Sequence, residues 1–445
     1  MPFAEGQSIS PRVTADLLHP AAMDAADAYG VVIDGQPGPT WFNYQVQLCV
    51  TPQNTWIACW TQGGYEANPD QRVVAARSRD NGRTWSEEII IERPGGGYCV
   101  PAWIVSFVVP HSGRVYLFYW YNIHGIPLRD AGDIFVKYSD DDGLTWSRRF
   151  PVGVPKTAMD RADIGDIHGW NFGQPRLQSS GQVLMTYTKI RRSSLYPHGW
   201  RLDAGNQWQP EPGTDPASRP TNEQGGSPND WETEVFFLEL TNILTEMDPA
   251  KLIFTFLPAG DEGLWVPYPG TERHFGQEGT VVELSGGQLL CVFRSRRGHP
   301  YYSLSADHGV TWSTPDVLRR CPSGDPFDQP CAPCPLTKLP DGRFVFLFHN
   351  MKPEGSGWYP RDPLWIAVGR EVPGVTENAG LYFTQPKVII YNDGVPGGPF
   401  KDFEIGYPQF YQFAGKHYVA YANKTCQLHI NEVPDALLDD ADWSG

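Results

Sequence analysis

Short apolar runs separated by compact turns dominate the chain, and the clearest example spans residues 278–312. In this stretch Val281–Leu284 precedes the turn Ser285–Gly287, a second run covers Leu289–Phe293, and a third covers Tyr301–Leu304. Apolar runs of this length, bounded by Gly and Ser, are typical of β-strands. Glu278 opens the unit and Arg294 ends its second strand, so both charges are expected at strand ends, where sheet proteins often place their chemistry.

The composition extends this pattern to the whole chain of 445 residues. Aromatic residues make up 13%, charged residues only 19%, and there are 46 Gly and 41 Pro. Many short strands joined by tight turns fit these values, and no long amphipathic helix is evident. Repeated sheets can share one core, so the length does not require two or three domains. We therefore predict an all-β fold in a single domain over residues 1–445.

A compact loop with the pattern S-x-D-x-G-x-T-W occurs three times, at Ser78–Trp85, Ser139–Trp146 and Ser305–Trp312, each time after a β-like run. Asp can cap backbone N–H groups in such a turn, Gly adopts a conformation that is costly for other residues, and Trp packs back onto the hairpin. The loop resembles the Asp box of the sialidase superfamily and other β-propellers. In those proteins it fastens the structure and takes no part in the chemistry.

This resemblance, with the loop positions, predicts a six-bladed β-propeller. Seven blades are the alternative if residues 168–260 form two blades. The segment 194–230 is rich in Gly, Pro, Asn and Ser, and we expect a long surface loop there. A strand near Gly30–Ile33 is expected to close the ring and so remove an exposed edge. The last two blades are expected to contain Phe344–Phe346 and Leu364–Ile366 in the fifth, and Phe410–Phe413, Tyr418–Tyr421 and Leu428–Ile430 in the sixth.

The net charge of −16 argues against a nucleic acid as partner, because such proteins need a basic surface. A local arginine cluster can still bind an anionic glycan. No apolar run reaches the ~18 residues that a membrane span needs, so we expect no span. The N-terminal MPFAEGQSISP lacks the features of a signal peptide. We expect a cytoplasmic protein or the mature form of a secreted one.

Three of the eight cysteines, Cys321, Cys331 and Cys334, lie in the segment CPSGDPFDQPCAPC. They suggest a structural zinc ion with His299, His308 or His349 as fourth ligand. A disulfide with one free thiol, or three separate thiols, are the alternatives. No cofactor is expected to be required for catalysis.

The resemblance to sialidases becomes more specific around Glu278. Sialidases carry an acid followed by V-V-E-L-x-x-G-x-L-L and an arginine, and this chain has Glu278, VVELSGGQLLCVF and Arg294. By the same resemblance Arg361 takes the place of a second arginine, and Tyr407 that of the nucleophilic tyrosine. The resemblance implies that Glu278 accepts the tyrosine proton and that the arginines bind a sugar carboxylate.

Two positions depart from the family pattern. Gln45 stands where sialidases have a first arginine, so the carboxylate clamp would contain two arginines and an amide. The acid–base residue is expected in the loop TQGGYEANPDQR, where Glu66 and Asp70 are both candidates. These departures bear on the identity of the sugar more than on the fold.

Two other classes of function remain open. Propeller-fold uronate lyases, ulvan lyases among them, use histidine, tyrosine and arginine, and His124, His168, Tyr187 and Arg201 are conceivable counterparts. A propeller that binds glycans without catalysis is the third hypothesis. It would use tryptophans that stack on sugar rings, such as Trp60, Trp103, Trp120, Trp170, Trp200 and Trp358.

Overall fold

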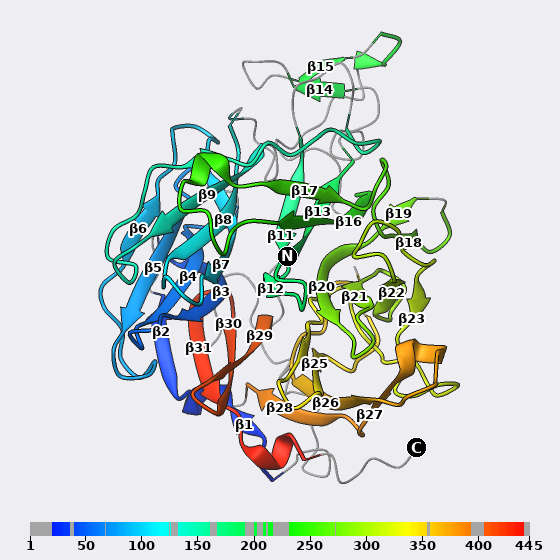
Figure 1. Cartoon of the computed structure of the whole chain (residues 1–445). Coiled ribbons are helices and arrows are strands. Elements are labelled where there is room, and N and C mark those ends of the chain that lie inside the picture. Colours follow the sequence, from blue (N-terminus) through cyan, green and yellow to red (C-terminus); the bar gives the residue numbers. More distant parts are fainter. Residues whose placement is uncertain are drawn as a thin grey trace, which may run out of the picture.

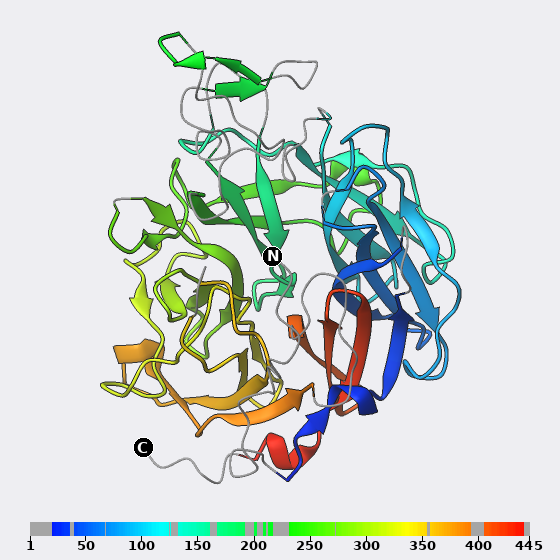
Figure 2. The same ribbon diagram turned by 180° about the vertical axis from the view of Figure 1, so that it is seen from behind.

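The computed structural model describes residues 20–35, 40–66, 68–123, 125, 132–160, 167–191, 200–202, 208–210, 212–216, 231–271, 273–353, 357–392 and 405–439. The protein is all-β, and its sheets surround a central axis as in a propeller (Figure 1). The same ring is seen from behind in Figure 2. Helical structure in these residues is limited to the 3-10 turns η2 (Ala25–Asp27), η5 (Pro249–Lys251), η6 (Glu377–Gly380) and η7 (Asp435–Leu437). No helix in the described ranges is long and apolar enough to cross a membrane.

The first two sheets are antiparallel and four-stranded, with strands in chain order. The first contains β3 (Phe42–Val50), β4 (Trp56–Gly63), β5 (Arg72–Ser78) and β6 (Ile89–Glu92). The second contains β7 (Pro101–Val108), β8 (Val115–Tyr121), β9 (Asp133–Ser139) and β10 (Phe150–Pro151). Every residue of β4 and β8 is buried, because neighbouring sheets cover both faces of these strands.

The stretch that opens at Glu278 forms the predicted meander. Its sheet contains β20 (Gln277–Glu283), β21 (Leu289–Arg294), β22 (Tyr301–Ser305) and β23 (Asp316–Val317). The next sheet contains β24 (Leu336–Lys338), β25 (Phe344–Phe348), β26 (Leu364–Glu371), β27 (Leu381–Phe383), β28 (Lys387–Tyr391) and β1 (Met23–Asp24). The two predicted strands of the fifth blade therefore pair directly, as β25 and β26.

Closure of the ring follows the prediction. The last sheet contains β29 (Ile405–Phe413), β30 (Lys416–Asn423), β31 (Gln427–Glu432) and β2 (Gly30–Asp34). The N-terminal β2 pairs antiparallel with β31, so chain segments from both ends of the sequence share one sheet. This pairing covers an edge of β31 that would otherwise be exposed.

The remaining large sheet is irregular. It contains β11 (Gly169–Phe172), β12 (Arg176–Leu177), β13 (Val183–Ile190), β16 (Thr233–Leu240), β17 (Phe254–Leu257), β18 (Val266–Pro267) and β19 (His274–Phe275). Between β13 and β16 the chain leaves this sheet and forms the pair β14 (Trp200–Leu202) and β15 (Trp208–Pro210), which Figure 1 shows beyond the ring. The predicted loop at 194–230 thus contains a short hairpin, and its other residues are mostly outside the described ranges.

The predicted number of blades is wrong: the propeller has five blades, not six or seven. Six sheets have four or more strands, but they are not equivalent. The seven-stranded sheet is interrupted by the hairpin β14–β15 and enlarged by β18 and β19, so it does not repeat the four-strand unit. Spacing between sequence motifs could not reveal this interruption, because an insertion and an additional blade lengthen the chain in the same way.

The three S-x-D-x-G-x-T-W loops share one hydrogen-bond pattern. In the loop at 305–312, Gly309 N donates to Ser305 Oγ at 2.8 Å, and Asp307 accepts from the backbone and side chain of Thr311 at 2.9 and 2.6 Å. The loops at 78–85 and 139–146 repeat these contacts within 0.1 Å. The Trp312 ring stacks on Phe237 with ring centroids 4.3 Å apart, which joins this loop to the neighbouring sheet.

Candidate active site

Five inner strands share an unusual backbone feature near their first residues. One non-glycine residue in each has a positive φ between 41° and 59°: Gln45, Trp103, Asn171, Glu278 and Tyr407. Each lies at a register shift between its strand and the next one. The left-handed conformation costs such residues roughly 1–2 kcal/mol, and bulges beside active sites commonly redirect side chains. The repetition of this strain around one axis indicates a shared site.

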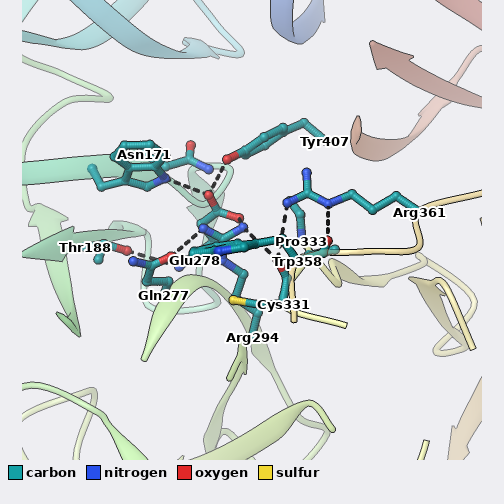
Figure 3. Close-up of polar contacts among 12 residues, drawn as sticks. Asn171, Thr188, Gln277, Glu278, Arg294, Cys331, Pro333, Trp358, Arg361 and Tyr407 are labelled. Carbon is teal, nitrogen blue, oxygen red and sulfur yellow. Dashed lines mark hydrogen bonds and ion pairs between the residues drawn. The ribbon is translucent and has the colours of Figure 1, made fainter. Parts of the chain in front are cut away.

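Glu278 and Tyr407 meet in this site from different sheets (Figure 3). The Tyr407 hydroxyl donates to Glu278 Oε1 at 2.5 Å. Trp170 Nε1 donates to the same carboxylate oxygen at 2.8 Å. Thr188 Oγ1 accepts from the Glu278 backbone N–H at 3.0 Å and so helps to fix the strained bulge. The tyrosine and the carboxylate are 129 positions apart in the chain, yet they form one buried hydrogen-bonded pair.

Arg294, the last residue of β21, forms an ion pair with Glu278. Its Nη1 lies 2.8 Å from Glu278 Oε2, and the two side chains are only 1% and 2% exposed. Arg294 Nε donates to Gln277 Oε1 at 3.1 Å, and Nη2 contacts the same amide oxygen. Burial alone would lower the pKa of Arg294, but Glu278 raises it above its ordinary value. The guanidinium is therefore a fixed positive charge beside the carboxylate.

Arg361 lies next to Arg294, and both donate to the carbonyl oxygen of Cys331, at 3.3 and 3.5 Å respectively. Arg361 Nη1 also donates to the Tyr44 hydroxyl at 3.2 Å, and its Nε to Trp358 O at 3.0 Å. The structure therefore brings the two predicted arginines to one carbonyl, in the same buried region as Glu278 and Tyr407 (Figure 3).

Aromatic rings form one wall of the site. The Tyr44 and Tyr407 rings meet edge to face with centroids 4.5 Å apart, and the Trp103 and Trp170 rings lie 4.2 Å apart. Gln277 and Tyr44 make contacts that the sequence did not suggest. Gln277 precedes Glu278 and Tyr44 precedes Gln45 in the chain. Their contacts depend on the bulges at these positions, which no sequence pattern predicts.

The environment of Tyr407 holds its proton tightly. Burial raises the pKa of this hydroxyl well above 10, and the negative charge of Glu278 raises the pKa further. Arg294 and Arg361 lower the pKa but do not reverse the shift. Tyr407 is therefore neutral at rest, and any attack by its oxygen requires transfer of the proton to an acceptor, for which Glu278 is already in hydrogen-bond contact.

Gln45 has the backbone conformation of the other bulge residues and is 1% exposed. Neither its amide oxygen nor its amide nitrogen has a hydrogen-bond partner within the described residues. A buried amide without partners is costly. The preceding Tyr44 contacts both Tyr407 and Arg361, so Gln45 stands beside the site.

The two acid–base candidates lie in the loop after β4. Asp70 Oδ1 accepts from the Gly64 backbone N–H at 3.1 Å, which stabilises the loop. Glu66 is partly exposed in the same loop. The assignment of either carboxylate as the acid–base residue stays a prediction.

The residues considered for a lyase are not brought together in the described part of the chain. His168 is fully buried, and Tyr187 packs in the main hydrophobic core, where its ring stacks on Phe236 with centroids 5.8 Å apart. Burial raises the pKa of Tyr187 far above its usual value. His124 and the side chain of Arg201 lie outside the described residues.

The tryptophans considered for sugar stacking are mainly core residues. Trp60, Trp103, Trp120 and Trp170 are at most 5% exposed, and the side chain of Trp200 is outside the described set. Trp358 is partly exposed, and the Arg294 and Arg296 guanidinium groups lie 5.2 and 4.8 Å from its ring centroid.

All three clustered cysteines are free thiols, with Cys331 and Cys334 buried. Over the described ranges, no group of three or more His, Cys, Asp or Glu is arranged to hold a metal ion. Burial raises the pKa of both Cys331 and Cys334. Zinc at Cys321, Cys331 and Cys334 stays a prediction, which metal analysis of the purified protein tests directly.

Comparisons with known proteins agree with this fold. Residues 269–419, which include Glu278, Arg294, Arg361 and Tyr407, match the model of the BNR repeat-like domain. A comparison with curated protein sequences finds no match.

Three solved structures illustrate the similarity of fold. An intramolecular trans-sialidase from Ruminococcus gnavus, in complex with oseltamivir carboxylate, has a TM-score of 0.58 at 11% identity over 93% of this chain and 98% of that chain. A protein of unknown function from Dyadobacter fermentans has a TM-score of 0.58 at 16% identity, covering 92% and 99%. An α-L-arabinanase from Penicillium chrysogenum, complexed with arabinobiose, has a TM-score of 0.50 at 15% identity, covering 93% and 99%. Identities this low establish the architecture alone, and fold does not fix function.

Proposed function

We propose that this chain, whose BNR-repeat propeller fold is that of the sialidase superfamily, is a retaining exo-glycoside hydrolase acting on a terminal acidic sugar. The observation that carries the proposal is the buried hydrogen bond of 2.5 Å between the Tyr407 hydroxyl and Glu278. A buried structural tyrosine also needs a hydrogen-bond partner, but a neutral acceptor is sufficient, whereas a tyrosine nucleophile needs a base in contact with its proton.

In the first step Tyr407 Oη forms a bond to the anomeric carbon while the glycosidic C–O bond breaks. The phenolic proton passes to Glu278, and the leaving oxygen takes a proton from Glu66 or Asp70. In the second step water attacks the anomeric carbon and releases Tyr407, which recovers its proton from Glu278, while the acid–base residue accepts a proton from the water. The sugar retains its anomeric configuration because two displacements occur.

A tyrosine nucleophile suits an acidic sugar because a neutral phenol approaches a carboxylate without the repulsion that a second carboxylate would meet. Arg294 and Arg361 would bind the sugar carboxylate with paired hydrogen bonds. Both guanidinium groups already contact the Cys331 carbonyl, so they are held together before substrate arrives.

Gln45 makes the proposed clamp different from one with three arginines. Its buried amide offers a donor NH₂ group and an acceptor oxygen without adding charge. We expect this amide to bind a neutral polar part of the sugar, such as a hydroxyl, next to the carboxylate. The substrate panel below should therefore include acidic sugars other than sialic acid.

The test is a panel of sialosides and uronosides, with measurement of free sugar and of an unsaturated product absorbing in the near ultraviolet. Hydrolysis with retention supports the proposal, an unsaturated product indicates a lyase, and binding without turnover indicates a glycan-binding propeller. Tyr407→Phe should lower kcat by at least about 100-fold, a typical loss for a chemical group of the reaction. Tyr138→Phe, on β9 of the second sheet, is the matched control. Activity of Tyr407→Phe near that of the control would refute the nucleophile assignment.

A further inference from the structure

The inner strands place a second set of residues at the opposite end of the central axis. The strained residues Trp103, Glu278 and Tyr407 lie near the starts of β7, β20 and β29. Residues near the ends of the same strands lie three to five positions later, which is roughly 10–17 Å at 3.3 Å per residue. These later residues, among them Ser106, Glu283 and Tyr411, line the end of the axis that we call the far end.

Two cavities lie at the far end, and Arg176 of β12 lines both. One, of about 210 Å³, is lined by the ends of β3, β7 and β29, including Gln47, Ser106 and Tyr411. The other, of about 400 Å³, is lined by Glu283, Lys338 and neighbouring residues. Both are much larger than the roughly 30 Å³ that one water molecule occupies in the liquid. Figure 1 places β12 near the centre of the ring.

The Arg176 guanidinium has a neutral partner in this position. Nη2 donates to Thr337 Oγ1 at 3.1 Å, and no carboxylate within the described residues forms an ion pair with it. Burial lowers the pKa of Arg176 to about 10, so the group is still charged at neutral pH. A partly buried cation that forms no ion pair within the described residues is unfavourable unless water or a ligand compensates its charge.

Tyr411 brings a hydroxyl group to the smaller cavity. Its oxygen accepts from the Leu48 backbone N–H at 2.9 Å, and the hydroxyl also forms a hydrogen bond with the side chain of Gln174, another lining residue. Glu283 brings a negative charge to the larger cavity, where its carboxylate oxygens accept from the backbone N–H and hydroxyl of Ser179, so the smaller cavity is the better place for an anion. Lys338, whose Nζ donates to the Glu283 carbonyl at 2.8 Å, also lines the larger cavity but forms an ion pair with Glu371 at 4.0 Å.

From these contacts we propose that Arg176 and Tyr411 form a binding site for a small oxyanion, such as inorganic phosphate or sulfate, at the far end of the propeller axis. The ligand would complete the charge balance of Arg176 and link β12 to β29. The site is separate from the Tyr407 site and does not depend on the proposed hydrolase activity.

The test is isothermal titration calorimetry of the full chain with sodium phosphate, sodium sulfate and sodium chloride at matched ionic strength. Wild type should bind one phosphate or sulfate and show a rise in melting temperature with either. Arg176→Met should lose at least tenfold in affinity, and Tyr411→Phe several-fold. Arg148→Met, which removes an exposed arginine that stacks on Phe150, should respond as wild type does.

Equal anion affinity in wild type and Arg176→Met would overturn the proposal, as would the absence of saturable binding of phosphate and sulfate to wild type. Saturable binding of chloride alone would also refute the oxyanion assignment. If Arg176→Met does not fold, titration of wild type and Tyr411→Phe decides the question. Glycoside hydrolysis by wild type, measured with and without phosphate, gives an independent readout of the Tyr407 site.

Discussion

Replacement of Glu278 by glutamine tests two roles of this residue separately, as proposed base for Tyr407 and as partner of the buried Arg294. The amide oxygen can still accept from Tyr407 and Trp170, because the side chain has the same shape. The negative charge is lost, however, so the fully buried Arg294 loses the carboxylate that lies 2.8 Å away. Breaking a buried ion pair by removing one partner typically costs about 3–5 kcal/mol. We therefore expect the free energy of unfolding to fall by about that amount.

Activity should fall further than stability explains. An amide cannot take the Tyr407 proton, and loss of a positioned base costs about 10²–10⁴-fold in rate. The free energy of unfolding is measured by urea denaturation and kcat by release of free sugar, both at a temperature where the variant is fully folded. The double variant Glu278→Gln/Arg294→Met removes the unpaired cation, so it should recover stability and stay inactive.

Two outcomes would refute this reasoning. A change in unfolding free energy below about 1 kcal/mol would mean that water, rather than Glu278, compensates Arg294. Activity of Glu278→Gln near that of wild type would exclude Glu278 as the base, whatever its effect on stability.

Three further predictions test the clamp, a buried histidine and a loop. Gln45→Arg should lower the free energy of unfolding by about 3 kcal/mol, since it buries an unpaired charge. Free sialic acid should then raise the melting temperature of this variant more than galactose does. Equal effects of the two sugars would contradict a carboxylate site there. Burial lowers the pKa of His429 from 6.5 to about 4, so the unfolded state binds more protons than the folded state between these pH values. The contribution of His429 to the free energy of unfolding should therefore be fully present above pH 6.5 and fall by roughly 3 kcal/mol as the pH drops to 4. Urea denaturation of His429→Gln should show a flatter profile over that window, and an unchanged profile would assign the acid sensitivity to other groups. Trp312→Ala should reduce the free energy of unfolding by about 2–4 kcal/mol, because it removes the stack on Phe237 and the hydrogen bond to Gly309. Trp312→Phe should cost about half as much. Equal losses in the two variants would mean that the stacking contributes little.

Local patterns in the sequence were sufficient for much of the fold. Alternating apolar runs and turn residues located β20, β21 and β22, and the closing strand β2 was also predicted. The hydrogen bonds that repeat in the three loops lie within eight residues, so one short stretch of sequence was sufficient to predict each of them. The number of blades was not predicted correctly, since the hairpin β14–β15 interrupts one sheet and sequence spacing cannot distinguish an insertion from a blade.

The candidate site divides in the same way. The sequence by itself determined the residue types, because a tyrosine, a glutamate and two arginines in a known order match a recognisable pattern. Only the tertiary structure decided that Tyr407 and Glu278 share a proton contact and that Arg294 and Arg361 meet at the Cys331 carbonyl. It also decided that Gln45 is buried with no hydrogen-bond partner among the described residues and that Arg176 lines two cavities. The physical reason is that these contacts join different sheets across a ring, and register shifts that no local propensity encodes aim the side chains inward.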